Sequence, residues 1–105
     1  MSLIIDTPPT PYYAVIFTSI KIAEDRGYSQ MSDRMIELLS SQDGFLGFES
    51  AREEIGITVS YWRDEASILA WKSNLEHREA QRLGKELWYE QYKIRVAKVD
   101  RDYEL

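Results

Sequence analysis

The residues best suited to chemistry lie in the segment from 57 to 77. His77 is the only histidine of the chain, and imidazole changes charge near neutral pH, so His77 is a candidate general base or ligand. Tyr61, Trp62 and Trp71 precede it. Phenol and indole side chains can line an apolar pocket and still offer a polar edge to a small molecule. We therefore expect a site here, with His77, Trp71 and Tyr61 as candidate catalytic residues.

Aromatic residues elsewhere in the chain can complete such a site. Phe17, Trp62 and Tyr89 are candidate substrate-binding residues, because Phe17 and Trp62 would wall an apolar cavity and Tyr89 would offer it a polar group. Each also has a structural interpretation, since large aromatic side chains more often belong to a core. Tyr89, with Trp88 and Tyr92, can equally form dimer contacts, where aromatic residues are enriched. Both interpretations stay open at the level of the sequence.

The composition excludes several classes of site. The chain has 105 residues, no cysteine and one histidine, so it lacks a thiolate nucleophile and a paired-histidine or thiolate metal site. Its formal net charge is −5, which argues against a nucleic-acid or anionic-membrane surface. No apolar run reaches the roughly 18 residues of a membrane span, and the first residues do not resemble a signal peptide. We expect a cytoplasmic protein without a bound metal.

The N-terminal residues predict an arm that precedes a single domain. All three prolines of the chain lie within residues 1–11. Proline fixes φ and removes a backbone donor, so we expect this stretch to be extended and the domain to occupy residues 12–105. Leu3, Ile4 and Ile5 are apolar for a free tail, and we expect them to lie against a partner subunit.

The domain shows a regular succession of strand and helix patterns. Alternating and helical apolar spacings predict strands at 12–22, 45–52, 57–63 and 88–98, and helices at 28–42 and 64–87. Asp64 is the expected N-cap of the second helix, and Ser73 and Asn74 are expected to break that helix in two. Gly47 predicts a bulge in the second strand or a close approach by another backbone. A change of apolar phase at 97–99 predicts another bulge in the last strand.

The resulting order, β-α-β-β-α-β, is typical of the ferredoxin-like class of α+β folds. It predicts a four-stranded antiparallel sheet with helices on one face. The first strand is apolar on both sides, so we expect it to be central. The sheet face without helices would be too apolar to meet water, and a second copy placed face to face would cover it.

The sequence also resembles a known family, the antibiotic biosynthesis monooxygenase (ABM) domains. The resemblance rests on GFLGFESAR at 44–52, ITVSYWRDEASILAWK at 57–72, EHREAQRLGKELWYEQY at 76–92 and IRVAKV at 94–99. It implies a homodimeric α+β barrel and a cofactor-independent monooxygenase that acts on an aromatic or quinol small molecule. The alternative that it leaves open is a non-catalytic dimeric module that binds a small hydrophobic ligand.

A related branch of this family degrades haem and implies a further alternative. Those enzymes use an asparagine on the first strand, a tryptophan on the helix after the third strand, and a more distant histidine as the haem ligand. Trp71 fits the tryptophan, whereas the first strand offers only Thr18 and Ser19 as polar residues in place of the asparagine. His77 falls about one helical turn too early, and Gln81, a poor haem ligand, would occupy its position. The residues therefore fit haem degradation less well.

Overall fold

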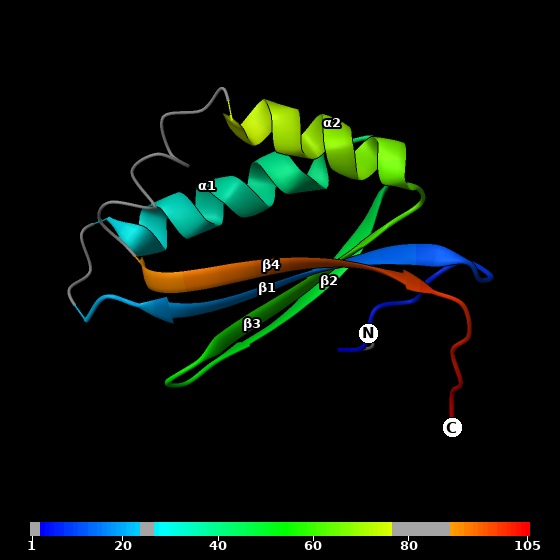
Figure 1. Cartoon of the computed structure of the whole chain (residues 1–105), viewed down its shortest axis with the longest axis horizontal. Helices are drawn as coiled ribbons and strands as arrows, with labels where there is room; N and C mark the ends of the chain where they lie inside the picture. Colours follow the sequence, from blue (N-terminus) through cyan, green and yellow to red (C-terminus); the bar gives the residue numbers. More distant parts are fainter. Residues whose placement is uncertain (1–2, 24–26, 77–88) are drawn as a thin grey trace.

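A computed structural model describes residues 3–23, 27–76 and 89–105, which form an antiparallel sheet with helices on one face (Figure 1). The elements are β1 (Tyr12–Lys21), α1 (Tyr28–Ser40), β2 (Phe45–Arg52), β3 (Gly56–Trp62), α2 (Glu65–Glu76) and β4 (Tyr89–Val99). The four strands follow the order β2-β3-β1-β4, with β1 in a central position. This is the predicted ferredoxin-like fold. Neither α1 nor α2 is long and apolar enough to span a membrane.

The strand register assigns each side chain to one face of the sheet. Tyr13 of β1 pairs with Trp62 of β3, and Ser19 pairs with Gly56. Paired residues of antiparallel strands point to the same side, so these four share one face. This side is the helix-facing face, because the ring of Trp62 contacts Trp71 of α2. The opposite side, which no described helix covers, is the open face (Figure 1).

The core between the sheet and α2 is centred on Trp62. Its side chain has no exposed surface, and Ile68 and Ser67 of α2 are also buried. The indole Nε1 donates a hydrogen bond of 2.9 Å to Ser60 Oγ, so the buried polar atom is satisfied. The apolar side of α2 and the even-numbered residues of β3 therefore form one packed layer.

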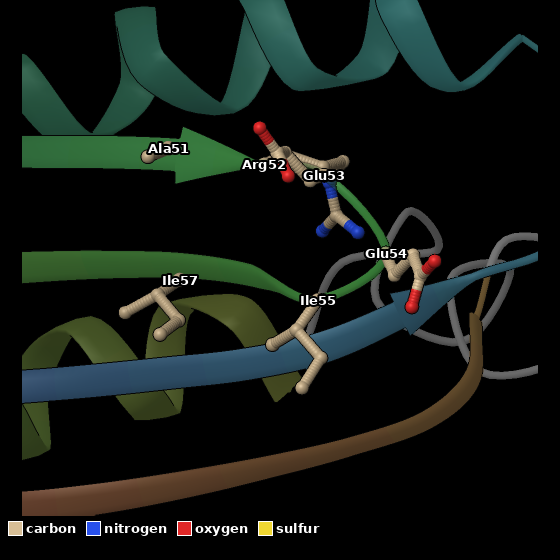
Figure 2. Close-up of a pocket in the computed structure, with 6 residues that line it drawn as sticks. All are labelled: Ala51, Arg52, Glu53, Glu54, Ile55 and Ile57. Carbon is tan, nitrogen blue, oxygen red and sulfur yellow. The ribbon is translucent and has the colours of Figure 1, made fainter.

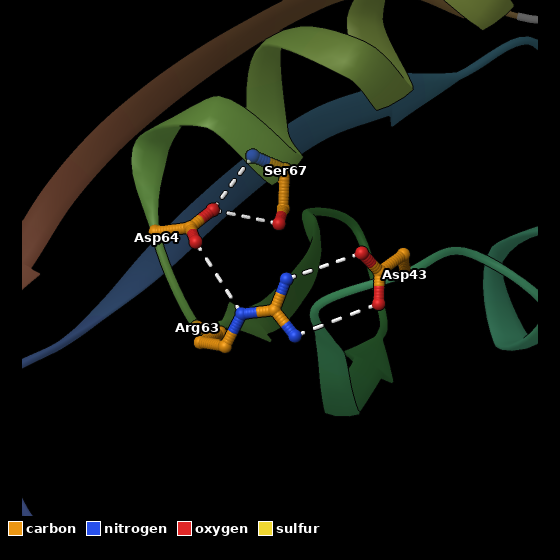
Figure 3. Close-up of polar contacts among 4 residues, drawn as sticks. All are labelled: Asp43, Arg63, Asp64 and Ser67. Carbon is orange, nitrogen blue, oxygen red and sulfur yellow. Dashed lines mark hydrogen bonds and ion pairs between the residues drawn. The ribbon is translucent and has the colours of Figure 1, made fainter.

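The start of α2 is held by a side-chain cap, as predicted for Asp64. Its Oδ1 accepts hydrogen bonds from the backbone N of Ser67 at 2.8 Å and from Ser67 Oγ at 2.7 Å (Figure 3). Arg63 binds both Asp64, at 3.3 Å, and Asp43, at 3.2 Å, in the loop before β2. Gly44, the next residue of that loop, has a φ of +84°, which is favourable for glycine. These contacts join the beginning of α2 to the beginning of β2.

The N-terminal arm packs against the open face of its own sheet. The side chain of Ile5 lies directly over Gly47, where an added Cβ would come within 2.7 Å of Ile5 Cγ2. The backbone N of Ile5 donates to Glu49 Oε2 at 3.1 Å. Tyr12, at the start of β1, donates from its hydroxyl to Asp102 of the C-terminal tail at 2.7 Å. Arm and tail thus cover one end of the open face, on the side where both termini lie (Figure 1).

Gly47 lies at the predicted bulge of β2, where the register with β3 shifts between Phe45 and Gly47. Its φ of +146° is a conformation that L side chains rarely adopt. The expectation that the arm lies against a partner subunit stays a prediction for Leu3 and Ile4, which are exposed. Ile5 packs within its own chain instead.

Two local predictions were wrong. Helix α2 runs without a break through Ser73 and Asn74 to Glu76, because the modest helix propensity of serine and asparagine costs only tenths of a kcal/mol each. The register of β4 with β1 is also regular from Ala97 to Val99, and its irregularity lies at the other end, opposite Lys21. The apolar phase changes because Ile94 and Val96 lie on the helix-facing face, whereas Ala97 and Val99 lie on the open face.

Candidate functional site

Two of the predicted residues, Trp62 and Trp71, meet at one end of the helix-facing face. Their ring centroids are 6.3 Å apart, with the ring planes tilted by 31°. Phe45 of β2 packs its ring edge-on against Trp62 at 5.4 Å. Trp71 is half-buried, so part of its indole reaches the surface. We call these three residues the tryptophan cluster.

Phe17 and Tyr89, two further predicted residues, meet at the other end of the same face. Their ring centroids are 5.4 Å apart in an edge-to-face arrangement. Tyr92 of β4 lies 5.6 Å from Phe17, and Tyr28, the first residue of α1, lies 5.7 Å from Tyr89 with perpendicular rings. We call these four residues the tyrosine cluster. Phe17 is four residues along β1 from the partner of Trp62, so the two clusters are roughly 13 Å apart along the sheet.

Tyr89 is the most strongly perturbed titratable group among the described residues. Burial raises the pKa of its phenol, and a hydrogen bond with Tyr28 raises that pKa further. The nearby positive charge of Arg52 acts in the opposite direction and is a smaller influence. Tyr89 therefore remains protonated at physiological pH, and it can serve as a hydrogen-bond donor but not as a base.

Beside the tyrosine cluster, the side chain of Arg52 extends from β2 over Gly56 of β3 and contacts Ser19 of β1. Its Nη2 donates to Ser19 Oγ at 2.5 Å, and its Nη1 lies 3.5 Å from the carbonyl oxygen of Ser19. Ser19 is only 2% exposed. Between the two residues lies Gly56, where an added Cβ would be 2.1 Å from Arg52 Cζ. The absence of a side chain at Gly56 thus makes room for the guanidinium.

Tyr61 is not part of either cluster, because it lies on the open face. Its hydroxyl donates to Glu49 Oε1 at 2.5 Å, and its ring packs edge-on against Tyr12 at 6.0 Å. Burial, followed by the hydrogen bond and charge of Glu49, raises the pKa of Tyr61 to about 12. The structure therefore does not bring Tyr61 together with Trp62 and Trp71.

His77, the remaining predicted catalytic residue, lies outside the described residues. Within 3–23, 27–76 and 89–105, no three histidine, cysteine, aspartate or glutamate side chains gather in an arrangement that could hold a metal ion. His77 thus remains a sequence-based candidate.

A hollow of about 540 Å³ lies at the turn between β2 and β3 (Figure 2). It is open to solvent and is lined by Ala51, Arg52, Glu53, Glu54, Ile55 and Ile57. Among the predicted site residues that the structure describes, none contributes to it. Arg52 borders this hollow and also contacts Ser19 on the helix-facing face, so it connects the turn to the tyrosine cluster.

Comparison with known proteins decides the family. Residues 11–83, well over half of the chain, match the family described as antibiotic biosynthesis monooxygenase. The chain belongs to the ABM family. It is 50% identical over 103 residues to the uncharacterized protein YqjZ of Bacillus subtilis (strain 168), covering 96% of this chain and 90% of that protein. The predicted family is therefore confirmed.

A fungal protein and a solved structure are also similar to this chain. The jasmonate monooxygenase ABM of Pyricularia oryzae (strain 70-15 / ATCC MYA-4617 / FGSC 8958) is 30% identical over 92 residues, which cover 83% of this chain but only 43% of the fungal protein. A crystal structure from Chloroflexus aurantiacus J-10-fl, of a protein named for the same family, matches with a TM-score of 0.58 at 18% identity. That match covers 87% of this chain and 97% of the other. The structural likeness confirms the fold alone.

Sequence reasoning about this ABM chain missed three residues around the tyrosine cluster: Tyr28, Arg52 and Ser19. Tyr28 falls on the apolar stripe of the helix expected at 28–42, so its position in the sequence marks it as a packing residue. Arg52 and Ser19 are 33 positions apart, and their contact crosses β3. The available signal was Gly56 at the start of a strand, since a glycine there often marks a close approach by another group.

Proposed function

We propose that this ABM protein is a homodimeric, cofactor-independent monooxygenase whose substrate is a phenolic or quinol-type aromatic molecule. In the simplest such reaction, a phenol with a free para position and O2 give a quinone and water. One oxygen atom enters the ring and the other leaves as water, so the substrate supplies every electron that reduces O2. The protein must then supply an apolar chamber, a proton acceptor for the phenol and donors for reduced oxygen.

The observation that carries this proposal is the pair of aromatic clusters on the helix-facing face. Strand and helix both contribute rings at each end: Trp62 with Trp71, and Phe17 and Tyr89 with Tyr28. Aromatic rings favour edge-to-face and offset contacts with one another, so they suit a flat aromatic ligand. The substrate would lie between α1, α2 and the sheet, with Tyr89 as a protonated donor at one end.

We assign the proton acceptor to His77, whose neutral imidazole can take a phenolic proton near pH 7. In the sequence, His77 follows Trp71 by six positions, and Trp71 lies on α2, which ends at Glu76. Tyr61 has no role in this proposal, because its hydroxyl points to the open face. The fungal relative supports the monooxygenase class, and its named substrate, jasmonate, is a second candidate compound for assay.

The test is O2 consumption with a panel of phenols and hydroquinones, with product analysis after reaction with isotopically labelled O2. Wild type should incorporate one labelled atom into the product. His77→Gln should lower kcat by about 100-fold or more, which is the usual contribution of a general base. Trp71→Ala should raise KM, whereas Trp71→Phe should retain most binding because it keeps an aromatic ring.

Tyr103→Phe is a matched control, since Tyr103 is 83% exposed in the C-terminal tail and should have no effect. Absence of turnover across the panel contradicts the proposal. Turnover that is unchanged in both His77→Gln and Trp71→Ala also contradicts it, because the reaction would then take place elsewhere.

One observation favours a second candidate, a dimeric module that binds a small hydrophobic ligand without turning it over. The side chain of Trp62 is 0% exposed and packs against both Phe45 and Trp71. Protein rings thus occupy this end of the space between sheet and helix. Calorimetric binding of the same phenols without any O2 consumption would select this candidate over the enzyme.

A further inference from the structure

We infer that Arg52 and Lys21 form a recognition site for a carboxylate group carried by the ligand, so that the preferred ligand is an anionic aromatic molecule. This inference rests on the proposed function, because it places the aromatic part of that ligand beside the tyrosine cluster. It adds the chemical class of the ligand and the two side chains that select it.

Arg52 is held in a defined position on the helix-facing face of the sheet. The guanidinium lies across Gly56 and donates to Ser19, which is buried. Arg52 nevertheless retains substantial exposed surface, so solvent and ligands can reach it. A planar guanidinium offers several N–H donors in a rigid fork that matches a carboxylate. Because Ser19 occupies only part of this donor set, the remaining donors can bind an anion.

Two cations, Lys21 and Arg52, lie close to the ring of Tyr28. Lys21 Nζ lies 4.7 Å from the centre of the Tyr28 ring, and Arg52 Cζ lies 5.9 Å from the same centre. No carboxylate in the described parts of the chain forms an ion pair with either cation. Both positive charges therefore lie beside Tyr28, and a carboxylate bound next to this ring would be attracted by both.

The surroundings of the two cations favour an anion on the side of Tyr28 and disfavour one in the hollow at the turn between β2 and β3. Helix α1 begins at Tyr28 with no side-chain cap and no acidic residue in its first turn, so its positive dipole end adds to the same potential. Glu53 and Glu54 lie beyond Arg52 in the turn and line the outer hollow (Figure 2). They make the hollow itself unfavourable for an anion. The carboxylate therefore belongs on the helix-facing side, beside Tyr28.

The experiment compares two probes of equal shape, naphthoate and naphthamide substituted at the same ring position, by calorimetry or NMR titration. Wild type should bind naphthoate about tenfold more tightly than naphthamide, which corresponds to 1.4 kcal/mol, and salt should reduce this preference. Arg52→Gln should abolish the preference and leave naphthamide affinity unchanged. A merely structural role of Arg52 would weaken both probes equally. Arg101→Gln, an exposed arginine of the tail, is the matched control and should retain the preference.

Gly56→Ala provides a second variant that keeps every charge. Its Cβ would lie 2.1 Å from Arg52 Cζ. This distance is too short for two non-bonded atoms, so the flexible guanidinium must move away from Ser19. We expect it to reduce the naphthoate preference as Arg52→Gln does. Equal affinity of wild type for the two probes, no detectable naphthoate binding, or an unchanged preference in Arg52→Gln would each overturn the inference. The proposed function is tested separately by O2 consumption with uncharged phenols. Failure of the carboxylate site in the binding experiment would leave that result unchanged.

Discussion

At the residue scale, Tyr61 shows how one step along a strand decides what a side chain can do. Trp62, the next residue, is enclosed on the helix-facing face, whereas Tyr61 lies on the open face with its hydroxyl on Glu49. Burial and the neighbouring carboxylate both favour the neutral phenol, and they raise its pKa to about 12. Tyr61 therefore contributes to stability through a hydrogen bond and is poorly suited to act as a base.

This contact predicts a specific dependence of stability on pH. The folded state holds the phenolic proton more tightly than the unfolded chain, so the stabilisation is complete below pH 10 and is lost as the pH rises toward about 12. Tyr61→Phe should lower the free energy of unfolding by about 1 kcal/mol at neutral pH. It should also flatten the alkaline loss of stability. Chemical denaturation across this range tests the prediction, and identical pH profiles for wild type and variant would refute it.

At the element scale, the start of α2 depends on the cap formed by Asp64. The carboxylate accepts from the side chain and the backbone N of Ser67, and these bonds lower the pKa of Asp64. A cap satisfies backbone donors that the first helical turn leaves without partners. Asp43 forms an exposed ion pair with Arg63. An exposed ion pair contributes little to the free energy of unfolding, so Asp43 should matter less than Asp64.

The cap predicts a ranking of three variants. Asp64→Ala should destabilise the protein most, Asp64→Asn less because an asparagine can still accept a hydrogen bond, and Asp43→Asn least. Because the folded pKa of Asp64 is lowered, its ionic contribution is present at neutral pH and is lost as the pH falls below the ordinary value of 3.8. Urea denaturation at neutral and acidic pH measures both effects. An equal loss for Asp43→Asn and Asp64→Ala would contradict the assignment.

At the scale of the whole molecule, the open face is covered only in part. Arm and tail cover the end at Tyr12, which is 5% exposed, whereas Ile57 at the other end is 45% exposed. Ile20 of β1 and Ile55 of the turn are also exposed there. Apolar patches of this kind commonly mark interfaces. The proposed homodimer would bury this surface against a second copy.

The dimer proposal predicts that a charge on the open face separates the subunits. Ile57→Lys should convert the protein to monomer in sedimentation or light-scattering measurements, because an unpaired charge would be buried in the interface. Ile94→Lys is the matched control, since Ile94 is 50% exposed but lies on the helix-facing side of β4. A monomeric wild-type protein would remove the basis for the dimer.

Much of this architecture follows from local patterns in the sequence. Apolar periodicity and glycine positions predict all four strands, and a capping aspartate marks the start of α2. Strand alternation also places Tyr61 and Trp62 on opposite faces, since side chains alternate with a period of two. The family follows from short blocks of residues in a fixed order. These features depend on neighbours within a few positions, so the sequence by itself determined them.

Tertiary structure decided which face received the helices and which distant residues met. The contact between Arg52 and Ser19 depends on the pairing of three strands, and the contact of Tyr28 with Tyr89 depends on how α1 lies over β4. Apart from Gly56, which marks the close approach of Arg52, neither contact leaves a local pattern, because the partners are separated by tens of positions. Tertiary packing also decided that α2 continues through Ser73. Weak local preferences there are smaller than the free energy gained by packing a helix against a sheet.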